Sequence, residues 1–193
     1  FAQGGFHVTG IDIDPERVSQ VNNGLSYIPD VPNETLAPLI LTKQSGGSLT
    51  ATTNYDVIKK ADAIIICVPS PLSKTRDPDI SHIVSATDGI ACRLRGQQLI
   101  ILESTTYPGT TEEVMLPRLT AGGLKIGQDI FLAYSPERVD PGQSQWTINT
   151  TPRVISGITP NCLAATQALF RSIMGQLVPV SSATVGEMVK LLE

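Results

Sequence analysis

Apolar runs along the chain stop abruptly at polar residues, and a helical pattern follows each stop. Residues 64–68, 99–102 and 130–134 are predominantly apolar, which is typical of parallel strands buried on both faces. Amphipathic helical segments separate them, so strands and helices alternate. This alternation predicts an α/β fold of the Rossmann-like, doubly wound type, with a mostly parallel sheet and helices on both faces.

Two helix starts carry capping signals. Asp14, Pro15 and Glu16 supply an N-cap, a proline at the first helical position and an acid in the first turn. Thr110 and Glu113 have the spacing of a capping box, which predicts a helix from about residue 111 to 120.

Polar side chains gather where the predicted strands end. In open α/β sheets, ligands bind outside the carboxyl ends of the strands, so these side chains are candidates for a binding site. Any one of them could instead only cap its own loop, but the repetition at three strands favours a site. The candidates are Ser70 after the first strand, Glu103, Ser104, Thr105 and Thr106 after the second, and Glu137, Arg138 and Asp140 after the third.

Asp12 ends a short predicted strand at residues 7–12, and it has no helix to cap because Asp14 does so. In dinucleotide-binding folds, an acid at the end of the second strand accepts hydrogen bonds from the adenosine ribose. A carboxylate there would repel a 2′-phosphate, which favours NAD over NADP. Arg17 argues the other way, because it could pair with that phosphate.

The composition narrows the class of protein. The net charge of −4 gives no basic surface for nucleic acid or an acidic membrane. No apolar run approaches the roughly 18 residues of a membrane span, and no signal peptide is evident. Cys67, Cys92 and Cys162 are odd in number and widely spaced, which suits neither a disulfide framework nor a metal site and indicates a cytoplasmic setting. Cys67 is expected to be buried within its strand.

The domain pattern looks incomplete at both ends. Residues 2–5 resemble the end of a helix that leads into a strand, so a first strand and a glycine-rich turn are expected upstream. Residues 1–183 are interpreted as one dinucleotide-binding domain. Residues 184–193 are interpreted as the start of an interdomain helix, with a substrate domain beyond the chain.

With these segments in place, the chain resembles the UDP-glucose/GDP-mannose dehydrogenase family, the nucleotide-sugar 6-dehydrogenases. It is most similar to the branch that acts on UDP-N-acetylhexosamines, such as UDP-N-acetylglucosamine, because Pro141 stands where the UDP-glucose branch has a second glutamate. The resemblance rests on Gly10-Ile-Asp-Ile-Asp14, Cys67-Val-Pro-Ser-Pro71, Glu103-Ser-Thr-Thr-Tyr-Pro-Gly-Thr-Thr111, Tyr134-Ser-Pro-Glu-Arg-Val-Asp-Pro-Gly142 and Gly186-Glu-Met-Val-Lys-Leu-Leu-Glu193.

The resemblance implies oxidation of a sugar C6 hydroxyl to a carboxylate in two hydride transfers to NAD, as a step towards polysaccharide synthesis. The family's nucleophilic cysteine, which carries a thiohemiacetal and then a thioester, would lie beyond Glu193, so these residues alone are expected to be inactive. A homodimer or higher oligomer, formed through the interdomain helix, is also implied.

The resemblance further assigns roles to residues. Asp12 and Arg17 would hold the ribose side of NAD, and Val68, Pro69, Ser70 and Ser104 would line the cofactor. Thr105 would position a water or the reacting oxygen, Glu137 would act as general base or orient the water, and Arg138 and Asp140 would contact substrate. Lys190 would stabilise the oxyanion, although its helical pattern alone suggests only an exposed lysine.

Three alternatives remain open at this point. The first is a UDP-glucose or other nucleotide-sugar 6-dehydrogenase. The second is a hydroxyacid dehydrogenase of the 6-phosphogluconate type, which shares the fold but needs no thiolate. The third is a nucleotide-binding module without catalysis, because fold alone does not determine function.

Overall fold

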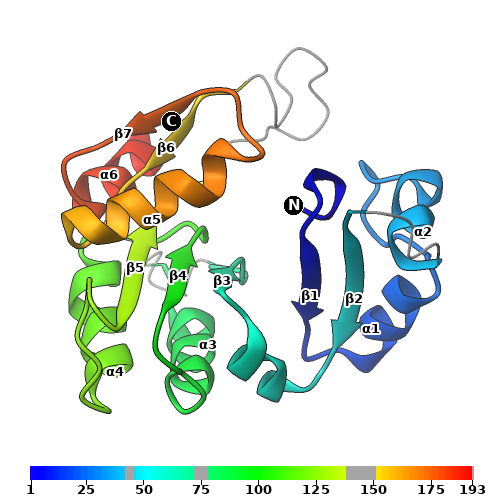
Figure 1. The fold of residues 1–193 in the computed structure, drawn as a ribbon, viewed down its shortest axis with the longest axis horizontal. Coiled ribbons are helices and arrows are strands. Elements are labelled where there is room, and N and C mark those ends of the chain that lie inside the picture. Colours follow the sequence, from blue (N-terminus) through cyan, green and yellow to red (C-terminus); the bar gives the residue numbers. More distant parts are fainter. Residues whose placement is uncertain (42–45, 72–77, 138–150, 193) are drawn as a thin grey trace. The chain divides into compact units, whose positions relative to one another are not determined.

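The computed structural model describes residues 1–41, 46–71, 78–137 and 151–192, and the chain forms two compact units. The first comprises residues 1–57 and the second begins at residue 58. Helices separate most consecutive strands, and the strand pairs among the described residues are all parallel (Figure 1). The α/β fold with parallel sheets that the sequence predicted is therefore confirmed.

The first unit contains a two-stranded parallel sheet. Strand β1 (His7–Ile11) pairs with β2 (Ser48–Thr52), with His7 opposite Ser48. Helix α1 (Pro15–Asn22) follows β1 directly, and the Asp14 side chain accepts a hydrogen bond from the Glu16 N–H, which confirms the predicted N-cap. The short 3₁₀ helix η1 (Ala2–Gly4) precedes β1, and α2 (Asn33–Leu41) precedes β2.

The second unit contains the sheet that positions the candidate site. Strands β3 (Ala63–Ile66), β4 (Gln98–Leu102) and β5 (Ile130–Tyr134) pair in that order, and all five residues of the central strand β4 are buried. Ile66 pairs with Leu102, and Leu102 pairs with Tyr134, so the three strands end level with one another. We call this the carboxyl edge of the sheet.

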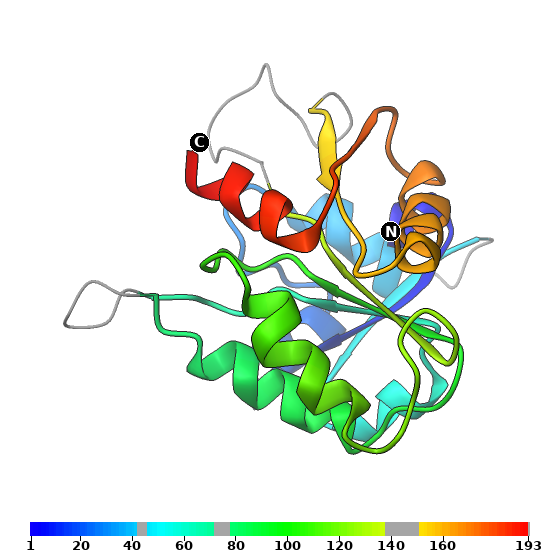
Figure 2. The ribbon, with the colours of Figure 1, turned by 90° about the vertical axis from the view of Figure 1, so that its left-hand side faces the viewer.

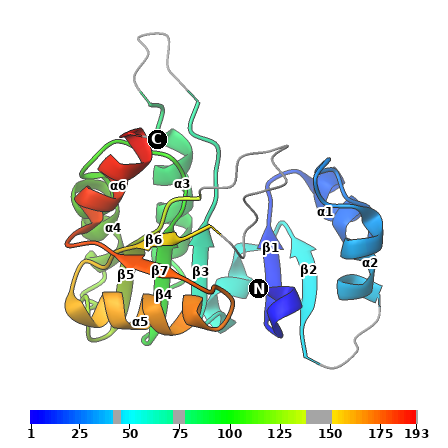
Figure 3. The same cartoon turned by 90° about the horizontal axis from the view of Figure 1, so that it is seen from above.

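Helices cover both faces of this sheet. Helix α3 (Ser81–Ala91) lies on one face and α5 (Pro160–Arg171) on the other (Figure 3). Helix α4 (Leu116–Thr120) packs beside α3 (Figure 2). The 3₁₀ helix η2 (Tyr55–Lys60) contains the point in the sequence at which the second unit begins. The unit further contains a π-helix, η3 (Thr110–Met115), and a second pair of parallel strands, β6 (Arg153–Ile155) and β7 (Leu177–Pro179). Helix α6 (Ala183–Leu192) is its last element.

The expectation that Cys67 is buried within a strand is wrong. Strand β3 ends at Ile66, one residue earlier, and Cys67 is exposed. The apolar run is longer than the strand because Cys67 and Val68 continue the run after the ladder with β4 has ended. Within the described ranges, no helix is long and apolar enough to cross a membrane.

Candidate functional site

The register of the second unit brings three strand-following residues together. Cys67, Glu103 and Ser135 come directly after β3, β4 and β5, whose last residues are paired. The Glu103 N–H donates to the Ile66 carbonyl, and the Ser135 N–H donates to the Leu102 carbonyl. The side chains that the sequence placed at separate strand ends therefore meet at one carboxyl edge.

Arg153, the first residue of β6, joins these side chains. It is 7% exposed, and its guanidinium lies over the Phe170 ring with Cζ 4.5 Å from the centroid. Nε donates to Ser135 Oγ at 2.8 Å, and Nη1 donates to Glu137 Oε2 at 3.3 Å. Nη2 donates to Glu103 Oε1 and to the Ser135 carbonyl oxygen. One buried cation thus holds two carboxylates.

Glu103 also contacts Cys67, whose thiol donates to Oε2 at 3.4 Å. Burial raises the pKa of Glu103, and the Arg153 charge opposes that rise. Burial of the thiol, and then the neighbouring Glu103 charge, raise the pKa of Cys67 far above its usual range. The thiolate is the reactive form of cysteine, so Cys67 is unsuited to be a nucleophile at neutral pH even though the residue is exposed.

Lys190 on α6 reaches the same loop. Its Nζ donates to the backbone carbonyl oxygen of Glu137 at 2.6 Å, and the residue is only half-buried. The helical pattern alone suggested an exposed lysine, and the contact with a residue 53 positions earlier is what distinguishes it. Glu137 is therefore held at its backbone by Lys190 and at its carboxylate by Arg153.

Helix α6 is fixed through the fully buried Glu187. Its carboxylate accepts from the Gly109 N–H at 2.6 Å, and from the N–H and hydroxyl of Thr111 at 2.9 and 2.6 Å. The predicted capping box is wrong: Gly109 is the N-cap of η3, and no side chain of its own caps it. Thr110 Oγ1 bonds instead to Thr106 Oγ1 and to the Tyr107 carbonyl, so the cap comes from a distant helix.

The predicted cofactor-lining residues follow β3 and β4. Ser104 is buried, and its hydroxyl donates to the Val68 carbonyl at 2.8 Å, which joins the two strand ends. Ser70 Oγ is buried and has no hydrogen-bond partner among the residues that the structure describes. Thr105 and Pro69 are exposed, and Val68 is half-buried. Thr105 is thus the exposed hydroxyl of this set, whereas the Ser70 hydroxyl is buried.

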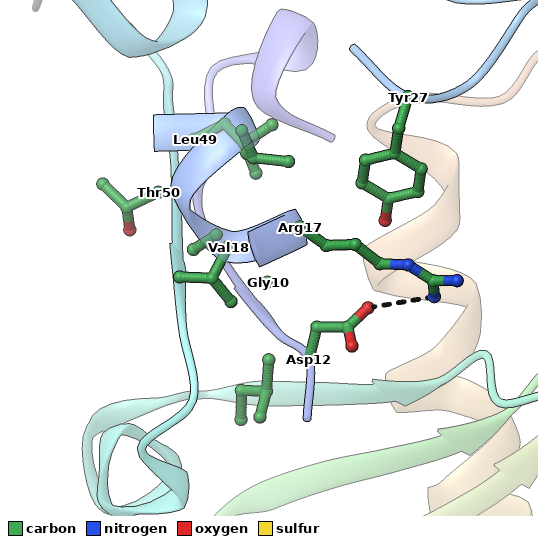
Figure 4. Close-up of a pocket in the computed structure, with 10 residues that line it drawn as sticks. Gly10, Asp12, Arg17, Val18, Tyr27, Leu49 and Thr50 are labelled. Atoms are coloured by element: carbon green, nitrogen blue, oxygen red, sulfur yellow. Dashed lines mark ion pairs between the residues drawn. The ribbon is translucent and has the colours of Figure 1, made fainter. Parts of the chain in front are cut away.

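The first unit has a cavity of its own at the end of β1, of about 210 Å³. Asp12, Arg17 and Tyr27 line it. Asp12 Oδ2 lies 3.7 Å from Arg17 Nη1, and the guanidinium of Arg17 lies over the Tyr27 ring, 5.4 Å from the centroid (Figure 4). Asp12 Oδ1 accepts from the Asp14 N–H. The remaining lining residues are Gly10, Ile11, Val18, Val21, Leu49, Thr50 and Ala51.

Two predicted substrate contacts, Arg138 and Asp140, lie outside the described residues. Sequence reasoning identified Glu103 as one of several polar candidates but missed two residues of the site, Arg153 and Glu187. Glu187 appeared only within a helical motif of the family resemblance. A local pattern carries little signal for them, because their partners lie between 16 and 78 positions away in the chain. The one available signal was an arginine at the start of an otherwise apolar strand.

Comparisons with known proteins identify the family of this chain. The model of the UDP-glucose/GDP-mannose dehydrogenase family, NAD binding domain, matches residues 1–174. UDP-N-acetyl-D-mannosamine dehydrogenase of Pyrococcus horikoshii is 35% identical over 100% of this chain and 45% of its own length. UDP-N-acetyl-D-glucosamine 6-dehydrogenase of Pseudomonas aeruginosa is 31% identical over 96% of this chain and 43% of its own.

Solved structures show the same relationship. The UDP-D-ManNAc dehydrogenase of Pyrococcus horikoshii superposes with a TM-score of 0.89 at 34% identity, over 99% of this chain and 45% of that one. The present chain thus spans less than half the length of the curated relatives it matches. It belongs to the UDP-glucose/GDP-mannose dehydrogenase family, with NAD as its cofactor.

Proposed function

We propose that the protein containing this chain oxidises the C6 hydroxyl of a UDP-N-acetylhexosamine to the carboxylate. One observation carries the proposal: Lys190 and Arg153, from two different elements, both hold Glu137 at the carboxyl edge, where ligands of such sheets bind. The reaction is an alcohol plus two NAD⁺ and one water, giving a carboxylate, two NADH and three protons.

The residues present suit NAD. The cavity at the end of β1 offers the Asp12 carboxylate to ribose hydroxyls, and Arg17 and Tyr27 flank it. The Ser70 hydroxyl has no hydrogen-bond partner among the residues that the structure describes, so a ligand could supply one. When bound, NAD⁺ accepts the hydride that leaves C6.

The chain's own residues would act on the sugar and the water. Lys190 would stabilise negative charge that develops on the C6 oxygen, which is effective because a preorganised cation needs no rearrangement during the reaction. Thr105, exposed beyond β4, would position the reacting oxygen or a water. Glu137, whose side chain is 47% exposed, would serve as general base for the water or orient it.

A cysteine beyond this chain would carry the covalent intermediate. Its thiolate would add to the C6 aldehyde as a thiohemiacetal, the second hydride loss would give a thioester, and water activated by Glu137 would release the carboxylate. Arg138 and Asp140 would contact the substrate. The product, a UDP-linked uronate, would serve polysaccharide synthesis.

A homo-oligomer formed through α6 is part of the proposal. Val185, Met188 and Leu191 are apolar and exposed, and they recur every three residues along this helix. That spacing places them on neighbouring positions of the helix surface, where a second copy could cover them. Sedimentation velocity of the full-length protein tests this, with Met188→Glu expected to shift the population towards monomer.

A substrate panel tests the proposed activity. The full-length protein is incubated with NAD⁺ and UDP-N-acetylglucosamine, UDP-N-acetylmannosamine, UDP-glucose or 6-phosphogluconate, and the absorbance of NADH is followed. A kcat/KM that is highest for one of the two acetylated sugars supports the proposal and identifies the C2 configuration. Preference for UDP-glucose or 6-phosphogluconate, or NAD⁺ binding without turnover of any of them, would reject it.

A further inference from the structure

We propose that Arg153 is a positioning residue for Glu137, and that Glu103 holds Arg153 in the orientation this requires. The inference rests on the proposed role of Glu137 in the reaction. It goes beyond that role because it assigns a task to a pair of residues that contact neither the sugar nor the cofactor in the proposed mechanism.

The guanidinium has almost no freedom to turn. Its Nε and Nη2 are engaged by the hydroxyl and the carbonyl oxygen of Ser135, which directly follows β5. The Ser135 hydroxyl in turn donates to the Val154 carbonyl at 2.8 Å, which ties β6 to the residue that follows β5. The Phe170 ring of α5 lies beneath the guanidinium plane at 4.5 Å. Nη1 is thereby presented to Glu137 in a fixed direction.

Glu103 completes the arrangement from the central strand. It is 11% exposed at its side chain, and its two oxygens have different partners, Arg153 on Oε1 and the Cys67 thiol on Oε2. A buried carboxylate and a buried guanidinium stabilise one another, since either alone would be costly to desolvate. Glu103 therefore fixes Nη2, and Nη1 of the same planar group remains directed at Glu137.

Glu137 itself needs such support. Its side chain is 47% exposed, and it lies two residues beyond Ser135 in the loop that follows β5. Lys190 contacts its backbone carbonyl, and a bond to the backbone does not itself orient the carboxylate. The Nη1–Oε2 hydrogen bond of 3.3 Å directs the carboxylate. Misplacement of a catalytic group by about 1 Å can cost on the order of 10²-fold in rate.

The test is a double-mutant cycle in the full-length enzyme. Arg153→Lys keeps the charge but cannot bond to Ser135, Glu103 and Glu137 at once, so kcat should fall roughly 10- to 100-fold while both KM values change less than about threefold. In the Glu137→Gln background, Arg153→Lys should have no further effect, because the group it positions is already disabled. Arg118→Lys, which alters a surface pair with Asp88, is the matched control and should leave kcat unchanged.

A second readout does not depend on the steady-state rate. After acid quenching, mass spectrometry of Arg153→Lys with substrate and NAD⁺ should show more covalently bound sugar than the parent enzyme, because hydrolysis of the intermediate is the step that slows. Glu103→Gln, which keeps the side-chain shape, should give the same change to a smaller extent. This variant keeps the test decisive if Arg153→Lys folds poorly.

The outcomes separate the two proposals. If Glu137→Gln retains full activity, the role of Glu137 in the proposed function is wrong. If Glu137→Gln is impaired but Arg153→Lys and Glu103→Gln are not, the positioning proposal is overturned alone. It is also overturned if Arg153→Lys lowers kcat by the same factor with and without Glu137, because that additivity would indicate a general structural role.

Discussion

The carboxylate of Glu187 accepts hydrogen bonds from both the N–H and the hydroxyl of Thr111, 76 positions earlier in the chain. With the bond from the Gly109 N–H, this fully buried side chain joins α6 to the start of η3. Lys190 lies one helical turn further along α6. The contact therefore links the helix that carries Lys190 to the segment that follows Thr105.

Replacing this carboxylate should destabilise the protein. In Glu187→Ala, the N–H groups of Gly109 and Thr111 lose their partner inside the molecule, and each buried unsatisfied group costs about 1–3 kcal/mol. A thermal unfolding scan of the full-length protein should show a clearly lower Tm. Glu112→Ala, an exposed acid of the same π-helix, is the matched control. Equal Tm values for the two variants would mean that the Glu187 contacts contribute no stability.

Glu187 should also make stability depend on pH. Burial raises its pKa above the ordinary 4.5, against the hydrogen bonds from Thr111 and Gly109. The folded protein then holds this proton more tightly than the unfolded chain does. The stabilising contribution is complete below pH 4.5 and is lost as the pH rises through the raised pKa.

Glu187→Gln removes this titration while keeping the shape of the protonated acid. As the pH rises from about 4.5 to 7, the Tm of the parent should therefore fall relative to the Tm of Glu187→Gln. A difference that stays constant across this range, or that moves in favour of the parent, would show that the pKa of Glu187 is not raised in the folded protein.

Asp12 should govern cofactor affinity. Loss of hydrogen bonds to a charged acceptor costs about 1.5–3 kcal/mol, so Asp12→Ala should weaken NAD⁺ binding roughly 10- to 100-fold. Titration calorimetry of the full-length protein measures this. Glu34→Gln changes an exposed acid of α2 that does not line the cavity, so this variant should bind NAD⁺ as tightly as the parent protein. Unchanged NAD⁺ affinity in Asp12→Ala would remove Asp12 from the cofactor site.

Gly157 should tolerate no side chain. A Cβ built there lies 2.2 Å from the backbone nitrogen and 2.7 Å from Cα of Leu163, and neither atom can move aside without shifting α5. Gly157→Ala should lower stability by about 1–3 kcal/mol. Gly122→Ala is the control, because nothing lies within 4 Å of its Cβ. Similar unfolding curves for both variants would contradict the close approach.

Local sequence features were enough to predict much of the fold. The Asp14 cap depends on residues two positions apart, and β5 occupies residues 130–134 as its apolar run predicted. The parallel sheet followed from the alternation of strands and helices. The end of β3 was misjudged because a strand stops where its ladder stops, whereas an apolar run stops where its side chains change.

The candidate site was predictable only in part. Glu137 stood out because a charged loop followed a buried strand. Arg153 and Glu103 are 50 positions apart, and nothing in either segment predicts that they meet. The start of η3 was assigned to a local capping box, although a residue on α6 supplies the cap. Contacts of this range arise from the packing of whole elements, which periodicity and capping rules do not describe.

The most direct test of the proposed function counts NADH formed per UDP-N-acetylhexosamine consumed by the full-length protein. The proposal predicts two, with steady turnover strongly reduced in Glu137→Gln and in Lys190→Ala but retained in Lys125→Ala, a change at an exposed lysine. One NADH per sugar would indicate a simple alcohol dehydrogenase that stops at the aldehyde. That result, or full activity without the Glu137 carboxylate, would contradict the mechanism proposed for this protein.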